Sequence, residues 1–319
     1  MSSSSGSELP VTGPLLDAEG ELEEAEALEH DPKEKALGPE PEARGPRTTG
    51  WSTFLWALPG MAWLGFFLVA PLVFIVLVSF WTYKLGAKSG FTTDWTLSNY
   101  DEVFHSSTYW DNMLSSFYTS VIAVVVCLVL GFPIAYFLAL KVQSLRMQIA
   151  LFIIALAPFW TSFLVRSVAW TYPFYEVLHR FHVAQPSEMS VRLALIQLYI
   201  LFMITPLFFT LAQVDRTALE AARDLGGNWW QTFRIVILPQ TLPGIVIGSI
   251  FVFVLTMGEY GTVLVVGQNY VQSVGTFVNS YITNAVQYPQ GAAAAVLLVA
   301  ALIVGVFAIT RFSNLREDL

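Results

Sequence analysis

Six long stretches of apolar residues constrain this chain more than any other feature. They run over residues 56–80, 113–140, 149–170, 193–213, 242–267 and 291–311. About 20 helical residues cross the roughly 30 Å hydrocarbon core of a bilayer, so each stretch can span a membrane once. Backbone groups in lipid must be hydrogen-bonded within the spanning structure, and runs this long favour helices over barrel strands. The sequence therefore predicts an all-α membrane protein with six transmembrane helices.

The composition excludes a soluble protein for the bulk of the chain. Of the 319 residues, 55% are hydrophobic and only 13% are charged, and the mean hydropathy is +0.59. A water-soluble globule of this length cannot cover so much apolar surface. A soluble enzyme and a nucleic-acid-binding protein are thus excluded, and the expected surroundings are a lipid bilayer with no nucleic acid.

The net charge belongs to the first 50 residues alone. They contain 12 acidic and 4 basic residues and no aromatic residue, whereas residues 51–319 contain 12 of each charge. Such a segment cannot bury enough apolar area to offset its ordering entropy. We expect a disordered acidic leader over residues 1–50 and one six-span domain over residues 51–319.

Basic residues predict the orientation of the spans. Arg44 and Arg47 directly precede the first apolar stretch, which favours a cytoplasmic amino terminus. With that orientation the cytoplasmic connections and carboxyl-terminal tail carry seven basic residues and the outer connections carry four. The excess agrees with the positive-inside rule and makes residues 214–241 the longest cytoplasmic connection.

Sequence signatures of catalysis are missing. No phosphate-binding loop, HExxH or CxxC motif occurs, and no nucleophile stands in a recognisable setting with a base. His179 and His182 lie near Glu176 in an outer connection, where a wet interfacial loop is the favoured interpretation over a metal site. We therefore expect no enzyme activity, no metal and no cofactor bound by this chain.

The connection over residues 214–241 has the pattern of two short amphipathic helices. Asp215 can cap the first helix, and Gly226 and Gly227 allow the positive φ that ends it. Pro239 is expected to stop the second helix before the fifth span begins. An aromatic face lies between these points, made of Trp229, Trp230 and Phe233.

The same connection resembles the signature loop of permease subunits of binding-protein-dependent ABC importers. That pattern is Glu-Ala-Ala, three residues, Gly, nine residues, Ile, one residue, Leu-Pro. Val236 replaces the Ile, a conservative departure. An amphipathic cytosolic helix alone is common in polytopic proteins, but here six positions match at the required spacing: Glu220, Ala221, Ala222, Gly226, Leu238 and Pro239.

Four further segments resemble the spermidine/putrescine-type permeases in particular. They are residues 96–100 (TLSNY), 158–170 (PFWTSFLVRSVAW), 258–260 (GEY) and 288–293 (YPQGAA). Together with the connection, the resemblance covers nearly all of residues 56–312. It implies a type I ABC importer permease fold in a bacterial cytoplasmic membrane.

The resemblance also implies partners. The 214–241 connection would be the coupling helix, which docks on a separate ATPase subunit that binds ATP and Mg²⁺. A second permease, expected to be a different chain, and an extracytoplasmic solute-binding protein would complete the importer. A polyamine is the first choice of solute, while relatives of this type carry opines, other amines, ferric iron, organic anions or phosphonates.

Two ionisable residues within the apolar stretches mark a candidate solute path. Arg166 lies in the third stretch and Glu259 in the fifth, and charges inside a span usually face the bundle interior. Glu259 would bind a cation, with π faces supplied by Trp160, Trp170, Tyr172 or Tyr260. The simpler interpretation, which the sequence favours, is that Arg166 pairs with Glu259 or with a second permease.

Two other classes of protein remain as alternatives. A proton-coupled secondary transporter would use Glu259 as its proton site and would need no ATPase, but the apolar stretches hold no further acid. A membrane enzyme or assembly factor would use the 214–241 connection for docking, but it would need a catalytic constellation.

Overall fold

The computed structural model describes residues 50–84, 91–142, 144–171, 180 and 187–317. Residues 1–49 of the expected leader, Tyr172, His179 and His182 lie outside these residues. Contacts divide the chain into two units, residues 1–66 and residues 67–319. In the first unit the structure describes α2 (Gly50–Leu64) and the start of a π-helical turn, η1 (Gly65–Val69).

The structure agrees with the six-span prediction when one bent pair of helices is counted as a single span. Five segments are long and apolar enough to cross a membrane. They are Trp56–Ser79, Ser107–Lys141, Glu188–Ala212, Trp229–Met257 and Tyr288–Arg311. The sixth is a pair of helices, Leu145–Trp160 and Phe163–Thr171, bent by 76° where they meet. Pro158 lies just before this bend, as its inability to continue a regular helix predicts.

The second unit contains the following elements. The helices are α3 (Ala70–Ser79), α4 (Ser98–His105), α5 (Ser107–Tyr136), α6 (Leu145–Leu156), α7 (Phe163–Thr171), α9 (Glu188–Ala212), α10 (Arg216–Asp224), α11 (Trp229–Thr232), α12 (Leu238–Met257), α13 (Gly261–Gly267), α14 (Val274–Thr283) and α15 (Tyr288–Glu317). The irregular turns are η2 (Phe137–Lys141), η3 (Ala157–Trp160) and η4 (Phe233–Ile237), and a hairpin pairs β1 (Trp81–Tyr83) with β2 (Phe91–Trp95).

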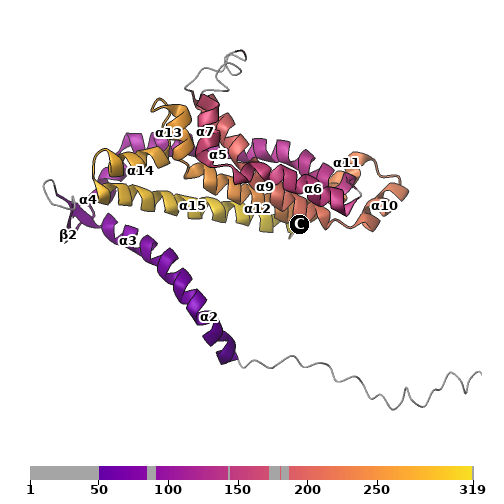
Figure 1. The fold of residues 1–319 in the computed structure, drawn as a ribbon, viewed down its shortest axis with the longest axis horizontal. Helices are drawn as coiled ribbons and strands as arrows, with labels where there is room; N and C mark the ends of the chain where they lie inside the picture. The colour runs from indigo at the N-terminus through magenta and orange to yellow at the C-terminus, as the bar shows by residue number, and fades with distance from the viewer. Residues whose placement is uncertain (1–49, 85–90, 143, 172–179, 181–186, 318–319) are drawn as a thin grey trace, which may run out of the picture. The chain divides into compact units, whose positions relative to one another are not determined.

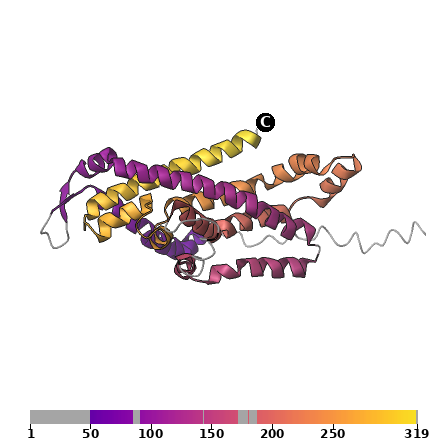
Figure 2. The same cartoon turned by 90° about the horizontal axis from the view of Figure 1, so that it is seen from above.

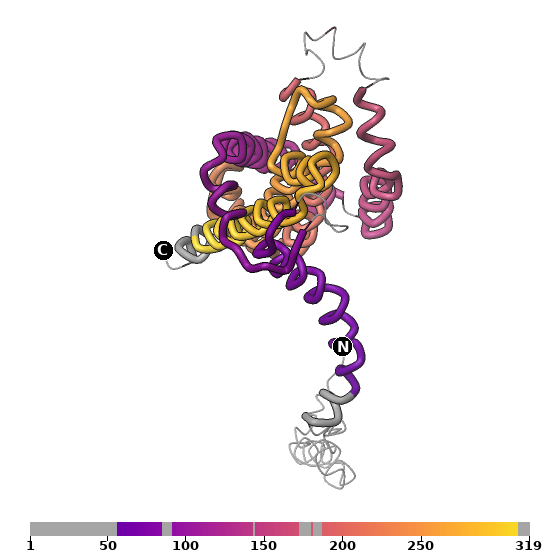
Figure 3. Tube along the Cα trace, turned by 90° about the vertical axis from the view of Figure 1, so that its left-hand side faces the viewer, coloured from indigo at the N-terminus to yellow at the C-terminus, as the bar shows by residue number. Residues whose placement is uncertain are grey.

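Four long helices of this unit, α5, α9, α12 and α15, run side by side (Figures 1 and 2). The closest packing joins α9 to α12 and to α5. The short helices α10 and α11 lie at one end of these four, and α4, α13 and α14 lie at the other. The helix α6 lies to one side of the four long helices (Figure 3).

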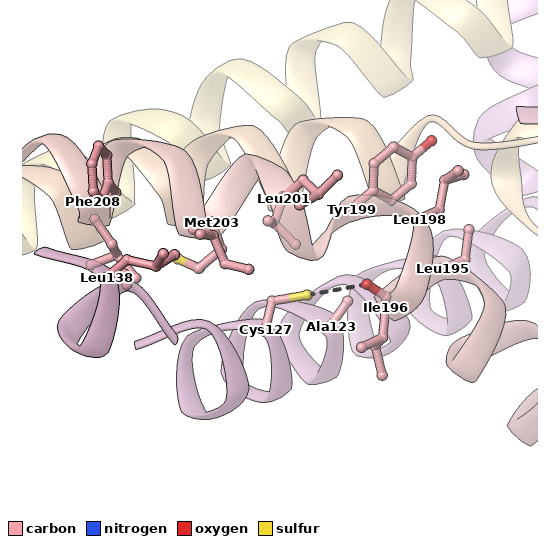
Figure 4. Close-up of a cluster of buried hydrophobic side chains, with 14 of the residues drawn as sticks. Ala123, Cys127, Leu138, Leu195, Ile196, Leu198, Tyr199, Leu201, Met203 and Phe208 are labelled. Atoms are coloured by element: carbon pink, nitrogen blue, oxygen red, sulfur yellow. Dashed lines mark hydrogen bonds between the residues drawn. The ribbon is translucent and has the colours of Figure 1, made fainter. Parts of the chain in front are cut away.

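The core lies between α5 and α9 (Figure 4). Its side chains are small on α5, where Ala123 and Cys127 face Leu195 and Ile196 of α9. The Cys127 thiol lies 3.7 Å from the Ile196 carbonyl oxygen. Large apolar side chains elsewhere are exposed, as expected for surfaces that face lipid or another subunit.

Glycines of α12 allow its close approach to α9. A Cβ atom at Gly244 would lie 2.2 Å from the Thr210 hydroxyl and 2.8 Å from the Pro206 carbonyl oxygen. At Gly248 it would lie 2.7 Å from the sulfur of Met203. Small residues at helix contacts are the usual device for packing helices closely in lipid.

Replacement of Gly244 by valine should therefore separate α9 from α12. Overpacking of this kind costs about 1–3 kcal/mol, and here part of the obstacle is backbone that cannot rotate away. Thermal unfolding of the purified complex should shift downward by several degrees. Gly131→Ala is the matched control, since its new Cβ would meet only side-chain atoms of Met203 and Ile204, at 3.3 Å or more.

The segment 96–100 anchors the β1–β2 hairpin. Asn99 is 2% exposed, and its amide donates to the carbonyl oxygens of Ser79 at 2.9 Å and Trp81 at 2.8 Å. The Tyr100 hydroxyl lies 2.6 Å from the Ser79 hydroxyl. These bonds satisfy the last carbonyl group of α3 and the first of β1, and they give the TLSNY segment a structural role.

Several predicted span limits are wrong. The second span begins at Ser107 and not at residue 113, because Ser106 caps the helix by accepting a hydrogen bond from the Tyr109 amide. The fourth begins at Glu188 and not at residue 193, after a capping box formed by Ser187 and Ser190. In both cases polar residues of the first turns hide the start of the helix from hydropathy.

The fifth span differs most from its prediction. It runs from Trp229 to Met257, so Pro239 does not separate a second amphipathic helix from the span. Pro239 lies in the first turn of α12, just after the π-helical turn η4. Such turns accommodate a missing backbone bond without ending the helix.

Candidate functional site

The segment between α9 and α12 begins with a capped, exposed helix. Asp215 accepts hydrogen bonds from the Thr217 amide at 2.9 Å and the Thr217 hydroxyl at 2.8 Å. These bonds lower the pKa of the Asp215 carboxyl, because they favour its charged form. The predicted cap of α10 is confirmed.

Loss of this cap should loosen α10 without unfolding the bundle. Asp215→Ala leaves the Thr217 amide unpaired, and we expect its hydrogen exchange to speed up while amides of α9 keep their protection. Because the folded-state pKa is lowered, the cap's contribution is complete above the unfolded value near 3.9 and is lost as the pH falls through the folded value. Asp215→Asn, which retains an acceptor, is the matched control.

The signature glycine, Gly226, and its neighbour Gly227 end α10 in a Schellman motif. The Gly227 amide donates to the Ala222 carbonyl and the Gly226 amide donates to the Arg223 carbonyl, both at 2.9 Å. Gly226 has φ +78°, the left-handed conformation that favours glycine. A Cβ atom at Gly227 would lie 2.6 Å from the Ala222 carbonyl oxygen. The positive φ is confirmed at Gly226, whereas Gly227 is required for close approach.

An aromatic surface follows this turn. Asn228 and Gln231 form a capping box at the start of α11, with both hydrogen bonds at 2.9 Å. Trp229 and Trp230 stack on Phe233, whose ring also contacts a ring of α5, Phe132, edge to face. Leu225 is 88% exposed, Trp229 64% and Trp230 58%. The apolar surface at this end of the bundle is thus rigidly held and open.

The other signature residues lie around this turn. Glu220 and Ala221 are exposed on α10, Leu238 is half-buried at the start of α12, and Pro239 is exposed. The side chain of Gln240 accepts a hydrogen bond from the Asp215 amide at 3.2 Å. This bond joins the start of the segment, before α10, to the first turn of α12. The spacing of the motif therefore describes one folded unit, from the cap of α10 to the first turn of α12.

A second feature is a cavity among the apolar helices. Its volume is about 800 Å³. It is lined by Phe159, Trp160, Thr161, Ser162, Phe163, Arg166, Leu198, Tyr199, Phe202, Val254, Leu255, Gly258, Glu259, Tyr260 and Gly261. The break between α6 and α7 forms one wall, α9 forms the second, and the break between α12 and α13 forms the third.

Glu259 lies in the break between α12 and α13 and not inside a span. Its carboxylate accepts hydrogen bonds from the Thr262 amide at 2.8 Å and from the Tyr199 hydroxyl. The Ser273 hydroxyl donates to the Glu259 carbonyl oxygen at 3.0 Å. At Gly275 of α14 a Cβ atom would lie 2.9 Å from the Gly258 carbonyl oxygen, so glycine is needed where α14 packs against the break. The carboxylate is therefore fixed at the cavity wall.

Arg166 lies in the wall formed by α7, which packs against α13. The structure does not pair Arg166 with Glu259, because the ion pairs formed by the described residues join other side chains, and the alternative pairing of Arg166 with a second permease stays a prediction. The Nε and Nη1 atoms of Arg166 are buried and have no hydrogen-bond partner among the described residues. Tyr199 lies between the two charges: it donates to Glu259 and interacts electrostatically with Arg166.

The other predicted path residues divide into two groups. Trp160 and Tyr260 line the cavity with Arg166 and Glu259. Trp170 lies away from it, packed against the core, and its indole nitrogen donates to the Gln197 side chain at 3.4 Å. Tyr172 lies outside the described residues.

Sequence reasoning missed several wall residues. Tyr199 and Phe202 of α9 are among them, and their rings lie 6.0 Å apart between centroids. The ring of Phe202 also lies 5.5 Å from that of Phe159. Two aromatic residues three positions apart do not distinguish this apolar helix from any other membrane helix. Their place in the cavity wall therefore becomes visible only in the fold. No cluster of possible metal ligands occurs among the described residues.

Comparisons with known proteins show what this chain is similar to. The chain is 30% identical over 266 residues to the spermidine/putrescine transport system permease protein PotB of Haemophilus influenzae, covering 80% of this chain and 91% of the relative. It is 29% identical over 238 residues to the inner membrane ABC transporter permease protein YdcU of Escherichia coli, covering 66% and 74%. No family model matches the chain.

A solved structure shares the fold. A chain of a bacterial ABC transporter involved in the import of the acidic polysaccharide alginate superposes with a TM-score of 0.60 at 15% identity, covering 83% of this chain and 95% of that one. Fold and relatives together define a multi-pass membrane permease of the ABC importer class. Within that class, the chain belongs to the family of spermidine/putrescine transport system permeases.

Proposed function

We propose that this chain forms half of the membrane pathway of an ATP-driven importer for a polyamine such as spermidine or putrescine. The observation that carries this proposal is the Glu259 carboxylate in a cavity with aromatic walls. A carboxylate binds an ammonium group, and the faces of Trp160, Tyr260 and Phe202 suit both the cation and the methylene chain between its amines. The names of the PotB relatives support the same class of solute.

The partners follow from the two ends of the bundle. The exposed surface of Leu225, Trp229 and Trp230 suits docking on a cytoplasmic ATPase subunit, where ATP and Mg²⁺ bind. Closure of two such subunits on ATP would move this segment, and through it α9 and α12, to expose the cavity alternately to each side. A second permease would complete the pathway, and a solute-binding protein would deliver solute outside. A solved alginate importer described with its periplasmic protein supports this arrangement.

The topology that we propose places residues 1–50 and the 214–241 segment in the cytoplasm of a bacterium, with six spans in its inner membrane. The acidic leader would remain outside the permease domain. Basic residues near the α10 end support this orientation.

Reconstitution tests the proposal. The permease, its second permease and the ATPase subunits are placed in liposomes with their binding protein, and uptake of labelled spermidine and putrescine is measured with and without ATP. Uptake that requires ATP and the binding protein is expected. Uptake by this chain alone, driven by a proton gradient, would instead support the secondary transporter, and ATP-driven uptake of other solutes only would remove the polyamine.

A further inference from the structure

The cavity holds two opposite charges that do not touch. Among its described lining residues Glu259 is the one acid and Arg166 the one base. A guanidinium in the same cavity opposes the entry of a polycation, because like charges repel. Its presence in a cavity proposed to bind amines therefore needs a physical reason.

The two charges are held very differently. Glu259 is fixed by the Thr262 amide and the Tyr199 hydroxyl. Arg166 has two buried nitrogens without a partner among the described residues, and an unsatisfied buried donor is costly. It lies on α7, just beyond the 76° break with α6, on a long side chain with several rotatable bonds. Arg166 is thus the partner that can move, and Glu259 is the acceptor that stays in place.

We propose that Arg166 is a tethered competitor of the solute: its guanidinium pairs with Glu259 once the cavity has released its cation, and an arriving ammonium group displaces it. This inference rests on the proposed function, because it assigns the release step of the same site. The pair satisfies the orphaned donors of Arg166 and neutralises Glu259 when no solute does so. Since Arg166 is tethered, its effective concentration near Glu259 is high, and solute binding stays weak enough for release.

Equilibrium binding and uptake test the inference in the assembled complex. Labelled spermidine binding is measured on the complex in lipid nanodiscs without binding protein, and uptake is measured in proteoliposomes. For Arg166→Gln we expect binding about tenfold tighter and maximal uptake about tenfold slower, because the competitor is lost and release becomes limiting. Arg166→Lys retains a tethered cation and should stay within about threefold of wild type in both measurements.

Two controls make these outcomes specific. Arg192→Gln removes a guanidinium that pairs with Glu188 at 2.5 Å outside the cavity lining, and it should change neither quantity. Arg166→Met replaces the glutamine variant if that complex does not assemble. Spermidine binding that is unchanged or weaker in the neutral variants, or equal in the lysine and neutral variants, would overturn the inference.

A second measurement does not depend on the identity of the solute. Melting temperatures of the solute-free complex are compared for Arg166→Gln, Glu259→Gln and the double variant. Pairing predicts that the double variant loses clearly less than the sum of the single variants, whereas additive losses exclude the pair. If the wild type neither binds nor transports a polyamine, the proposed function fails, and this cycle still decides whether Arg166 and Glu259 pair.

Discussion

Replacement of Glu259 by glutamine is expected to reduce maximal solute uptake about 100-fold while the complex still assembles in the membrane. Glutamine retains one oxygen, which can accept from the Thr262 amide, and its NH2 group can donate to the oxygen of the Tyr199 hydroxyl in place of the bond that this hydroxyl donates to the carboxylate, so the side chain still ties the break between α12 and α13. What is lost is the charge opposite the solute's ammonium group. A hydrogen bond to a charged group contributes about 1.5–3 kcal/mol to the free energy of binding. Each ~1.4 kcal/mol corresponds to a tenfold change in the binding or rate constant.

ATP-driven uptake in proteoliposomes measures this effect, with assembly checked by gel filtration. Glu188→Gln is the control, because this carboxylate belongs to the amino-terminal end of α9 and not to the cavity lining. Glu259→Asp should be intermediate, since its shorter side chain keeps the charge but cannot reach both partners. Uptake by Glu259→Gln within about threefold of wild type would show that the carboxylate only holds the helix break.

The membrane architecture was predictable because lipid leaves the chain few choices. A spanning segment must satisfy its own backbone, so hydropathy and length alone identify six segments. The ends of the segments were not predictable in the same way. Ser106 and Ser187 start their helices before hydropathy rises, and Pro239 lies in a turn that a π-helix makes tolerable. The ends of these helices depend on local hydrogen bonds, which average hydropathy does not record.

The two sites were predictable to different degrees. The segment from Asp215 to Pro239 is contiguous, so its cap, its glycine turn and its aromatic residues appear in the sequence in the order in which the fold uses them. The cavity is assembled from breaks in two spans and a face of α9. Arg166 and Glu259 stand out because charges are rare in spans. Tyr199, which lies between them, has no such signal, and its role depends on a register that only the packing of α9 against α7 and α13 determines.

Gly226→Val is expected to uncouple ATP hydrolysis from transport. At φ +78° a β-branched residue is strained, although nothing lies within 4 Å of the position of a new Cβ atom. The cost, about 1–2 kcal/mol, therefore comes from the backbone alone. The variant can relieve it by opening the turn, which breaks the bond from the Gly227 amide to the Ala222 carbonyl and changes the angle between α10 and α11.

The expected result is a complex that still hydrolyses ATP but takes up solute at least about tenfold more slowly per ATP. Basal ATPase activity and uptake are measured on the same proteoliposome preparation. Gly226→Asn is the matched control, because asparagine adopts the left-handed conformation readily and should retain most of the coupling. Gly227→Ala tests the neighbouring position by a different mechanism, since its Cβ would lie 2.6 Å from a backbone oxygen that cannot rotate away. If Gly226→Val couples ATP hydrolysis to uptake as well as Gly226→Asn does, the geometry of this turn is not needed for coupling. The exposed side chains of Leu225, Trp229 and Trp230 would then be the next part of the segment to substitute.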